Sequence, residues 1–406
     1  MDQYTDYLES RGHEISPEDD NYLEELMAVA ASFRTFDAAL DNFMAAHGYT
    51  GALTDLEAKL DFLRSRFTES GVTPLPRNMR KWFTEHRSIE RSTAFQLCFA
   101  FGLDVPQTQD FFRRVCLDRG FDCHDIREAI CYYCLRHGRS YADAQTLMAR
   151  SPISSGSLER TRLRLDQDVL FTGSIIAELD RFTDDEALLG YFEKNLHHFR
   201  YNHATAHRCI ARLWERIAPE EGLANRERTE LLGVKTTAHR SVADLFWQMM
   251  GLDERDEEGR HLYVLHSDRS LKPILKDNLL LHHLAEADFP DRLSIEEILS
   301  GKHKSDEKIR KTLIFLLFYQ FWVSAALKRS DASYHACGGD ADRCIDTIDR
   351  YLLECGYPAL YYGNPFDWLF LFAAEDEYPL ATLRDFIHEL YLYKAEHPAC
   401  TDKSNP

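Results

Sequence analysis

Residues 75–104 read LPRNMRKWFTEHRSIERSTAFQLCFAFGLD. The first third of this stretch is basic and short, a polar segment follows, and the last part is strongly apolar. Apolar residues at three- and four-residue spacing on both sides of the polar segment are typical of helices. The stretch therefore predicts a short basic helix, a polar turn and a buried helix in immediate succession.

The charge of this stretch differs from that of the chain around it. Residues 77–91 contain five Lys or Arg and two Glu, whereas residues 1–76 contain five basic and fifteen acidic residues. The whole chain carries a formal charge of −19. Such a charge repels nucleic acid at long range, so that any DNA contact has to be made by a local basic surface.

Composition predicts an all-α protein. The 406 residues are 44% hydrophobic and 28% charged, which is typical of a globular chain, and they contain few Gly and Pro. The longest apolar run, residues 313–327, is interrupted by Gln320 and Ser324 and is too short to span a bilayer. We read it as a buried helix and expect no membrane contact. Ten scattered cysteines and an acidic N-terminus lead us to expect a cytoplasmic protein with reduced thiols.

The order of helical patterns suggests a helix-turn-helix-like region followed by a larger multi-helical domain. A Thr54–Glu57 capping box predicts the start of a helix that continues to Phe67. Small and polar residues at 151–157 (SPISSGS) are the best linker candidate. The predicted regions are residues 1–150, with the module at about 54–115, a His-rich middle region at 158–300, and a C-terminal helical region at 301–406.

The basic helix has the side chains that a DNA-reading helix needs. Arg77, Arg80 and Lys81 are spaced i, i+3 and i+4 and share one face, opposite Met79, Trp82 and Phe83. Arg and Asn pair with guanine and adenine edges, whereas cations further along suit phosphate. The candidate DNA-binding residues are therefore Arg77, Asn78, Arg80, Lys81, Arg87 and Arg91.

Residues 78–112, NMRKWFTEHRSIERSTAFQLCFAFGLDVPQTQDFF, resemble the latter half of the lambda-repressor-like (XRE-type) helix-turn-helix domain. The following YADAQTLM segment is similar to what trails this domain in some uncharacterised bacterial relatives, and the resemblance covers about residues 55–150. In that family the recognition helix reads the major groove, which implies the role of Arg77, Asn78, Arg80 and Lys81. The resemblance also implies a dimer, because one recognition helix covers only a half-site.

Two clusters have the residue types of metal sites. Cys123, His124, Cys131 and Cys134 lie within twelve residues, but the Cys-x-x-Cys pair falls inside a helical pattern, and we interpret these cysteines as buried rather than zinc-bound. The segment HHFRYNHATAH lacks the Glu of a His-Glu-x-x-His hydrolase, so we predict no metal there either. Its histidines are His197, His198, His203 and His207.

The sequence offers no glycine-rich phosphate loop, nucleophile elbow or paired-acid motif, and we predict neither an enzyme nor a bound cofactor. The expected function is that of a bacterial DNA-binding regulator of transcription, whose helical C-terminal part associates or senses a ligand. The alternative is a helical adaptor, or a component of a bacterial defence complex, that binds protein instead of DNA. The two differ in whether the cations at 77–91 form an open positive surface or pair with carboxylates.

Overall fold

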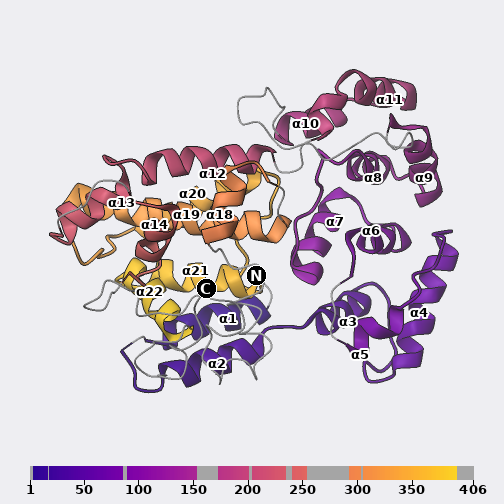
Figure 1. The fold of residues 1–406 in the computed structure, drawn as a ribbon. Helices are drawn as coiled ribbons and strands as arrows, with labels where there is room; N and C mark the ends of the chain where they lie inside the picture. Colours follow the sequence, from indigo (N-terminus) through magenta and orange to yellow (C-terminus); the bar gives the residue numbers. More distant parts are fainter. Residues whose placement is uncertain are drawn as a thin grey trace, which may run out of the picture. The chain divides into compact units, whose positions relative to one another are not determined.

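The computed structural model describes residues 3–16, 18–85, 89–152, 172–200, 204–234, 240–253, 292–302 and 305–390. The regular structure in these ranges is helical throughout, with no strand (Figure 1). The all-α prediction is therefore confirmed. None of the helices in these ranges is both long enough and apolar enough to cross a bilayer.

The chain forms two compact units, which do not coincide with the regions predicted from sequence. Unit 1 comprises Met1–Phe33, Ala206–Tyr351 and Ala359–Pro406, and unit 2 comprises Arg34–Thr205 and Leu352–Pro358. Residues on both sides of the predicted linker thus belong to unit 2. The reason is packing between distant segments: α1 (Gln3–Glu14) contacts α21 (Pro365–Glu375), and α9 (Tyr141–Arg150) contacts α11 (Asp185–Lys194).

Unit 2 begins with a group of three helices around the basic stretch. They are α3 (Phe36–Ala46), α4 (Leu56–Glu69) and α5 (Met79–Thr84). The N-cap of α4 is Asp55, whose side chain accepts a hydrogen bond from the Ala58 amide at 3.0 Å. The helix therefore begins one residue later than the capping box predicted at Thr54 would require.

The remaining helices of unit 2 surround a core rich in phenylalanine. Asp104 and Ser140 each form a capping box at the start of a helix, as short polar residues do at N-caps. Fully buried side chains such as Leu97 and Ile130 lie in this core. The elements are α6 (Arg91–Ala100), α7 (Val105–Phe111), the π-helical turn η1 (Phe112–Cys116), α8 (Ile126–Arg136), α9, α10 (Thr172–Leu179), α11 and the 3₁₀ turn η3 (Leu196–Arg200).

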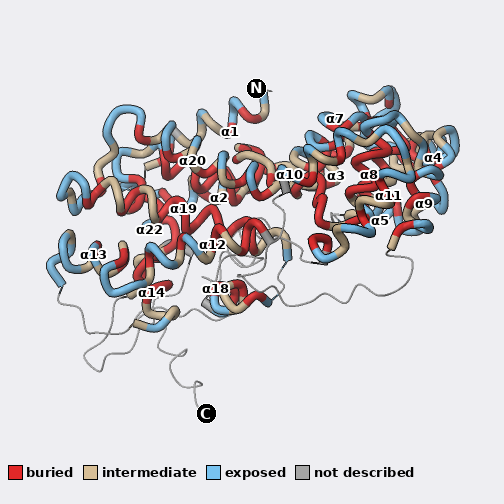
Figure 2. The backbone as a smooth tube through the Cα atoms, turned by 90° about the horizontal axis from the view of Figure 1, so that it is seen from above, coloured by how far each residue is buried: buried red, intermediate tan, exposed pale blue. Residues whose placement is uncertain are grey.

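Unit 1 is built around one long helix, α19 (Asp306–Arg329), in which every residue from Ile309 to Tyr319 is buried (Figure 2). This confirms the buried helix expected at residues 313–327. The other elements are α1, α2 (Tyr22–Ser32), α12 (Ala204–Ile217), α13 (Leu223–Arg226), the π-helical turn η4 (Glu227–Leu231), α14 (Val242–Met249), α18 (Arg292–Leu299), α20 (Asp340–Glu354), α21 and α22 (Pro379–Leu390). Helix α19 contacts α13, η4, α18 and α22, and α21, which packs against α22, contacts α1.

A buried carboxylate joins four of these segments. Glu227 is completely buried, and its carboxylate accepts hydrogen bonds from Tyr319 Oη at 2.6 Å, Tyr334 Oη at 2.5 Å, Gln248 Nε2 at 2.6 Å and Arg384 Nη2 at 3.0 Å. Burial by itself would raise the pKa of Glu227, but the charge of Arg384 and the three other donors outweigh it and hold this pKa below its ordinary value. The carboxylate is therefore ionised and fully paired. We call these five residues the Glu227 cluster.

Candidate nucleic-acid interface

Helix α5 is anchored through one side only. Met79 and Trp82, three residues apart, are both buried, and the helix packs against α3 and α4. Beside them the ammonium of Lys59 lies 4.3 Å from the centre of the Phe83 ring and pairs with Asp41 at 3.0 Å. The predicted anchoring face is thus present, and it fixes which face of α5 is left to solvent.

Of the four residues predicted to read DNA, Arg80 and Lys81 lie on this helix, whereas Arg77 and Asn78 lie in the turn that leads into it, so the predicted helical face is two residues shorter at its start. Arg77, Asn78, Arg80 and Lys81 are all exposed, with more than half of the Arg80 and Lys81 side chains accessible. Asn78 is the N-cap of α5, yet its side chain makes no capping hydrogen bond. Its amide therefore remains available to a partner outside the chain.

Two of these cations pair with carboxylates. Arg80 forms an ion pair with Glu57 of α4, and Lys81 Nζ lies 3.0 Å from Glu85 one turn further on. Exposed pairs of this kind are worth only about 0–1 kcal/mol, because water screens both charges. They reduce the positive potential of the face without preventing a phosphate from replacing the carboxylate. In the sequence Glu57 is notable only as part of the predicted capping box, and nothing in the local pattern marks either Glu57 or Glu85 as a partner of these cations.

Arg91 lies in a different environment from the one predicted for a phosphate contact. Its guanidinium donates to Glu128 Oε1 at 2.8 Å and Oε2 at 2.7 Å, to Asp118 Oδ2 at 2.7 Å, and to the Arg119 and Gly120 carbonyls at 3.0 and 2.5 Å. All three nitrogens of the guanidinium are thus used within unit 2. Because this geometry gives Arg91 a structural role, we withdraw it as a DNA contact.

The partners of Arg91 come together through local turns that the sequence analysis did not detect. The π-helical turn η1 ends at Leu117, whose φ of 51° lies in the left-handed region, and Asp118 follows directly. Burial raises the pKa of Glu128, and the charge of Arg91 opposes that rise. Charge and spacing within one segment cannot reveal such a site, since its acceptors lie 27 to 37 residues away.

The connection between α4 and α5, and the length of α5, differ from those of a simple helix-turn-helix. Residues 70–78 connect α4 to α5, which is longer than the three or four residues typical of that turn, and α5 spans six residues. The predicted candidate Arg87 lies outside the described residues. The face available for contact is therefore compact: the N-cap and outer side of one short helix.

The cysteines of the candidate metal cluster lie in the core of unit 2. Cys98, Cys123, Cys131 and Cys134 are buried free thiols, and burial raises the pKa of Cys134 to about 12, so these groups stay protonated. Within the described ranges, no three His, Cys, Asp or Glu side chains are arranged to hold a metal ion. His203 lies outside those ranges, whereas His198 and His207 are buried.

Comparison with known proteins gives no relative for this chain. No family model, no curated protein and no solved structure matches it.

Proposed function

We propose that this protein is a DNA-binding regulator of transcription that contacts DNA through the outer face of α5. The observation that carries the proposal is that this helix has one buried apolar face and one exposed basic face. Met79 and Trp82 hold it in the core, while Arg77, Asn78, Arg80 and Lys81 project outward. An anchored helix with an exposed basic and amide-bearing side is the arrangement that major-groove readers use.

The chemistry of the face fits this role. Arginine makes paired hydrogen bonds to guanine, asparagine makes them to adenine, and lysine neutralises phosphate. A six-residue helix covers at most one half-site, so we propose that the chain binds as a dimer. The formal charge of −19 opposes long-range attraction, and binding should therefore be modest and sensitive to salt.

Replacing Arg77, Arg80 and Lys81 together by Ala should reduce affinity for duplex DNA at least about tenfold and flatten its dependence on salt, because up to three phosphate-neutralising charges are lost. The measurement is fluorescence anisotropy of a labelled random-sequence duplex at low and moderate salt. The matched control removes the same charge from exposed arginines elsewhere in unit 2, through the substitutions Arg114→Ala, Arg136→Ala and Arg181→Ala.

The control triple variant should bind DNA as the unmodified protein does, after correction for the small change in overall charge. Thermal unfolding of both variants checks that folding is intact. An unmodified protein that does not bind at low salt would contradict the proposal, as would equal affinities of the two triple variants.

The second candidate is a helical adaptor that binds another protein. It is favoured by one observation, the pairing of Arg80 with Glu57 and of Lys81 with Glu85. An adaptor keeps such cations neutralised within its own surface, whereas a DNA reader has to exchange the carboxylates for phosphates.

Substituting Glu57→Gln and Glu85→Gln together separates the two candidates. If α5 binds DNA, the double variant should bind several-fold more tightly, because two competing carboxylates are gone and exposed pairs of this kind are weak. The anisotropy assay above measures this directly, with Glu69→Gln, another exposed glutamate of α4, as control. An unchanged affinity in the double variant favours the adaptor.

A further inference from the structure

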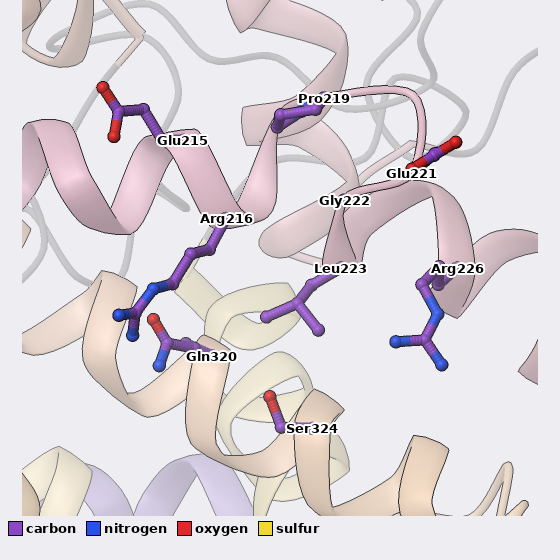
Figure 3. A pocket seen from close by; sticks show the side chains of 9 residues that line it. All are labelled: Glu215, Arg216, Pro219, Glu221, Gly222, Leu223, Arg226, Gln320 and Ser324. Carbon is purple, nitrogen blue, oxygen red and sulfur yellow. The ribbon is translucent and has the colours of Figure 1, made fainter.

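Unit 1 contains a pocket of about 460 Å³, all of whose lining residues belong to this unit. It opens where the end of α12, the turn at 218–222 and α13 face the middle of α19 (Figure 3). Its volume falls within the range of small-molecule sites. The lining residues are Glu215, Arg216, Pro219, Glu221, Gly222, Leu223, Arg226, Gln320 and Ser324.

The two arginines of the pocket differ in their partners. Arg226 forms a double contact with Glu230, at 2.7 and 3.2 Å. Arg216 is exposed, and no carboxylate of the described residues pairs with it. In Figure 3 its side chain extends toward Gln320, whereas the carboxylate of Glu215 points to the other side of α12. Arg216 is thus a cation at the pocket that is free to bind an anion.

The floor of the pocket offers hydrogen bonding that the protein does not use. Gln320 Oε1 is buried and has no hydrogen-bond partner, and Ser324 follows one turn later on α19. A buried acceptor without a donor is unfavourable. Because the terminal torsion of glutamine is soft, the amide can turn its oxygen toward a donor that enters the pocket. Leu223 supplies an apolar wall between the two arginines (Figure 3).

We propose that this pocket binds a small organic carboxylate that also carries a hydroxyl or amide donor. The carboxylate pairs with the guanidinium of Arg216, which suits it geometrically. The donor binds Gln320 Oε1 and Ser324, and the carbon chain lies on Leu223. Glu221, which also lines the pocket, repels a multiply charged anion such as phosphate more strongly than a single carboxylate. The site belongs to unit 1, and its existence does not depend on DNA binding.

Calorimetric titration of the full chain with four probes at constant ionic strength tests this class of ligand. Gluconate carries both groups, hexanoate has only the carboxylate, sorbitol has only the hydroxyls, and inorganic phosphate is the competing anion. Gluconate should bind at millimolar concentration or below, and each of the others at least about tenfold more weakly, since each lacks one of the required contacts. Absence of gluconate binding overturns the proposal, and so does equal binding of hexanoate, sorbitol or phosphate.

Variants then place the ligand in the pocket. Arg216→Gln should weaken gluconate binding at least about tenfold. Arg212→Gln, one turn earlier on α12 and outside the pocket lining, should leave it unchanged. Gln320→Leu should weaken gluconate but not hexanoate, and thermal unfolding confirms that each variant is folded. Equal gluconate affinity in the Arg216 and Arg212 variants would show that the ligand binds elsewhere.

Discussion

Replacing Arg91 by Ala is expected to destabilise unit 2 by about 2–3 kcal/mol at pH 7, because hydrogen bonds to charged groups are lost and Glu128, whose pKa burial already raises to about 7, loses the cation that opposes this rise. The substitution removes five hydrogen bonds and leaves the largely buried Glu128 carboxyl, among the described residues, with the Asp122 amide at 2.6 Å as its remaining hydrogen-bond donor. Hydrogen exchange of the α6 and α8 amides measures the effect within this unit, and thermal unfolding measures it for the chain.

A matched exposed arginine provides the control for this prediction. Arg114 pairs with Asp110 one turn earlier on the surface, and Arg114→Ala should change stability by less than about 0.5 kcal/mol. Combining Arg91→Ala with Glu128→Gln should restore part of the loss, because the uncompensated charge is removed. If the Arg91 and Arg114 variants were equally stable, the structural role given to Arg91 would be refuted.

The second large effect is expected at Glu227 in unit 1. Replacing it by Ala leaves the Arg384 charge and the buried hydroxyls of Tyr319 and Tyr334 without their acceptor, which should cost about 3–5 kcal/mol at pH 7. Guanidinium-induced unfolding measures this loss of stability for the chain, and hydrogen exchange of the α19 and α22 amides measures it within unit 1. Glu230→Ala, a fully exposed glutamate of the same π-helical turn, is the matched control.

Lowering the pH should also remove the stabilisation that the ionised Glu227 carboxylate provides. The pKa of Glu227 is lowered in the folded protein, so its ionised form stabilises the fold above the unfolded value of about 4.3, and this stabilisation is lost as the pH falls through the folded value. A Glu227→Gln variant has no such group to titrate. The stability difference between the two proteins should therefore shrink as the pH drops from 7 toward 3, and a constant difference would contradict this account.

Local patterns were sufficient to predict the helices and the faces of the basic segment. The spacing of Met79 and Trp82 placed one side of α5 in the core, and the apolar run at residues 313–327 marked the central helix of unit 1. Both inferences depend only on neighbours within two helical turns. The same periodicity assumed that the helix also includes Arg77, which lies instead in the turn before it.

What depends on distant segments was not predicted. The role of Arg91 requires Asp118 and Glu128, and the boundaries of the units require the pairing of α1 with α21. The pocket is a similar case, since Arg216 and Gln320 are separated by more than a hundred residues and neither is conspicuous in its own segment. Composition and short-range spacing contain no information on which of many acidic or apolar segments will meet.

The division of unit 1 between the two ends of the chain has a consequence for its biosynthesis. Trp368 Nε1 donates to the Leu8 carbonyl at 2.9 Å, and the Trp368 ring meets Phe33 edge to face at 6.1 Å. Helices α1 and α2 are synthesised long before these partners and therefore cannot complete this packing until residues near 368 have been made. Residues 34–205, synthesised in between, are free to fold first, because compact units fold separately. Closing so long a loop costs little extra at equilibrium but delays assembly, so growing chains should expose the apolar side of α1 and α2 to chaperones or proteases until residues near 368 have been synthesised.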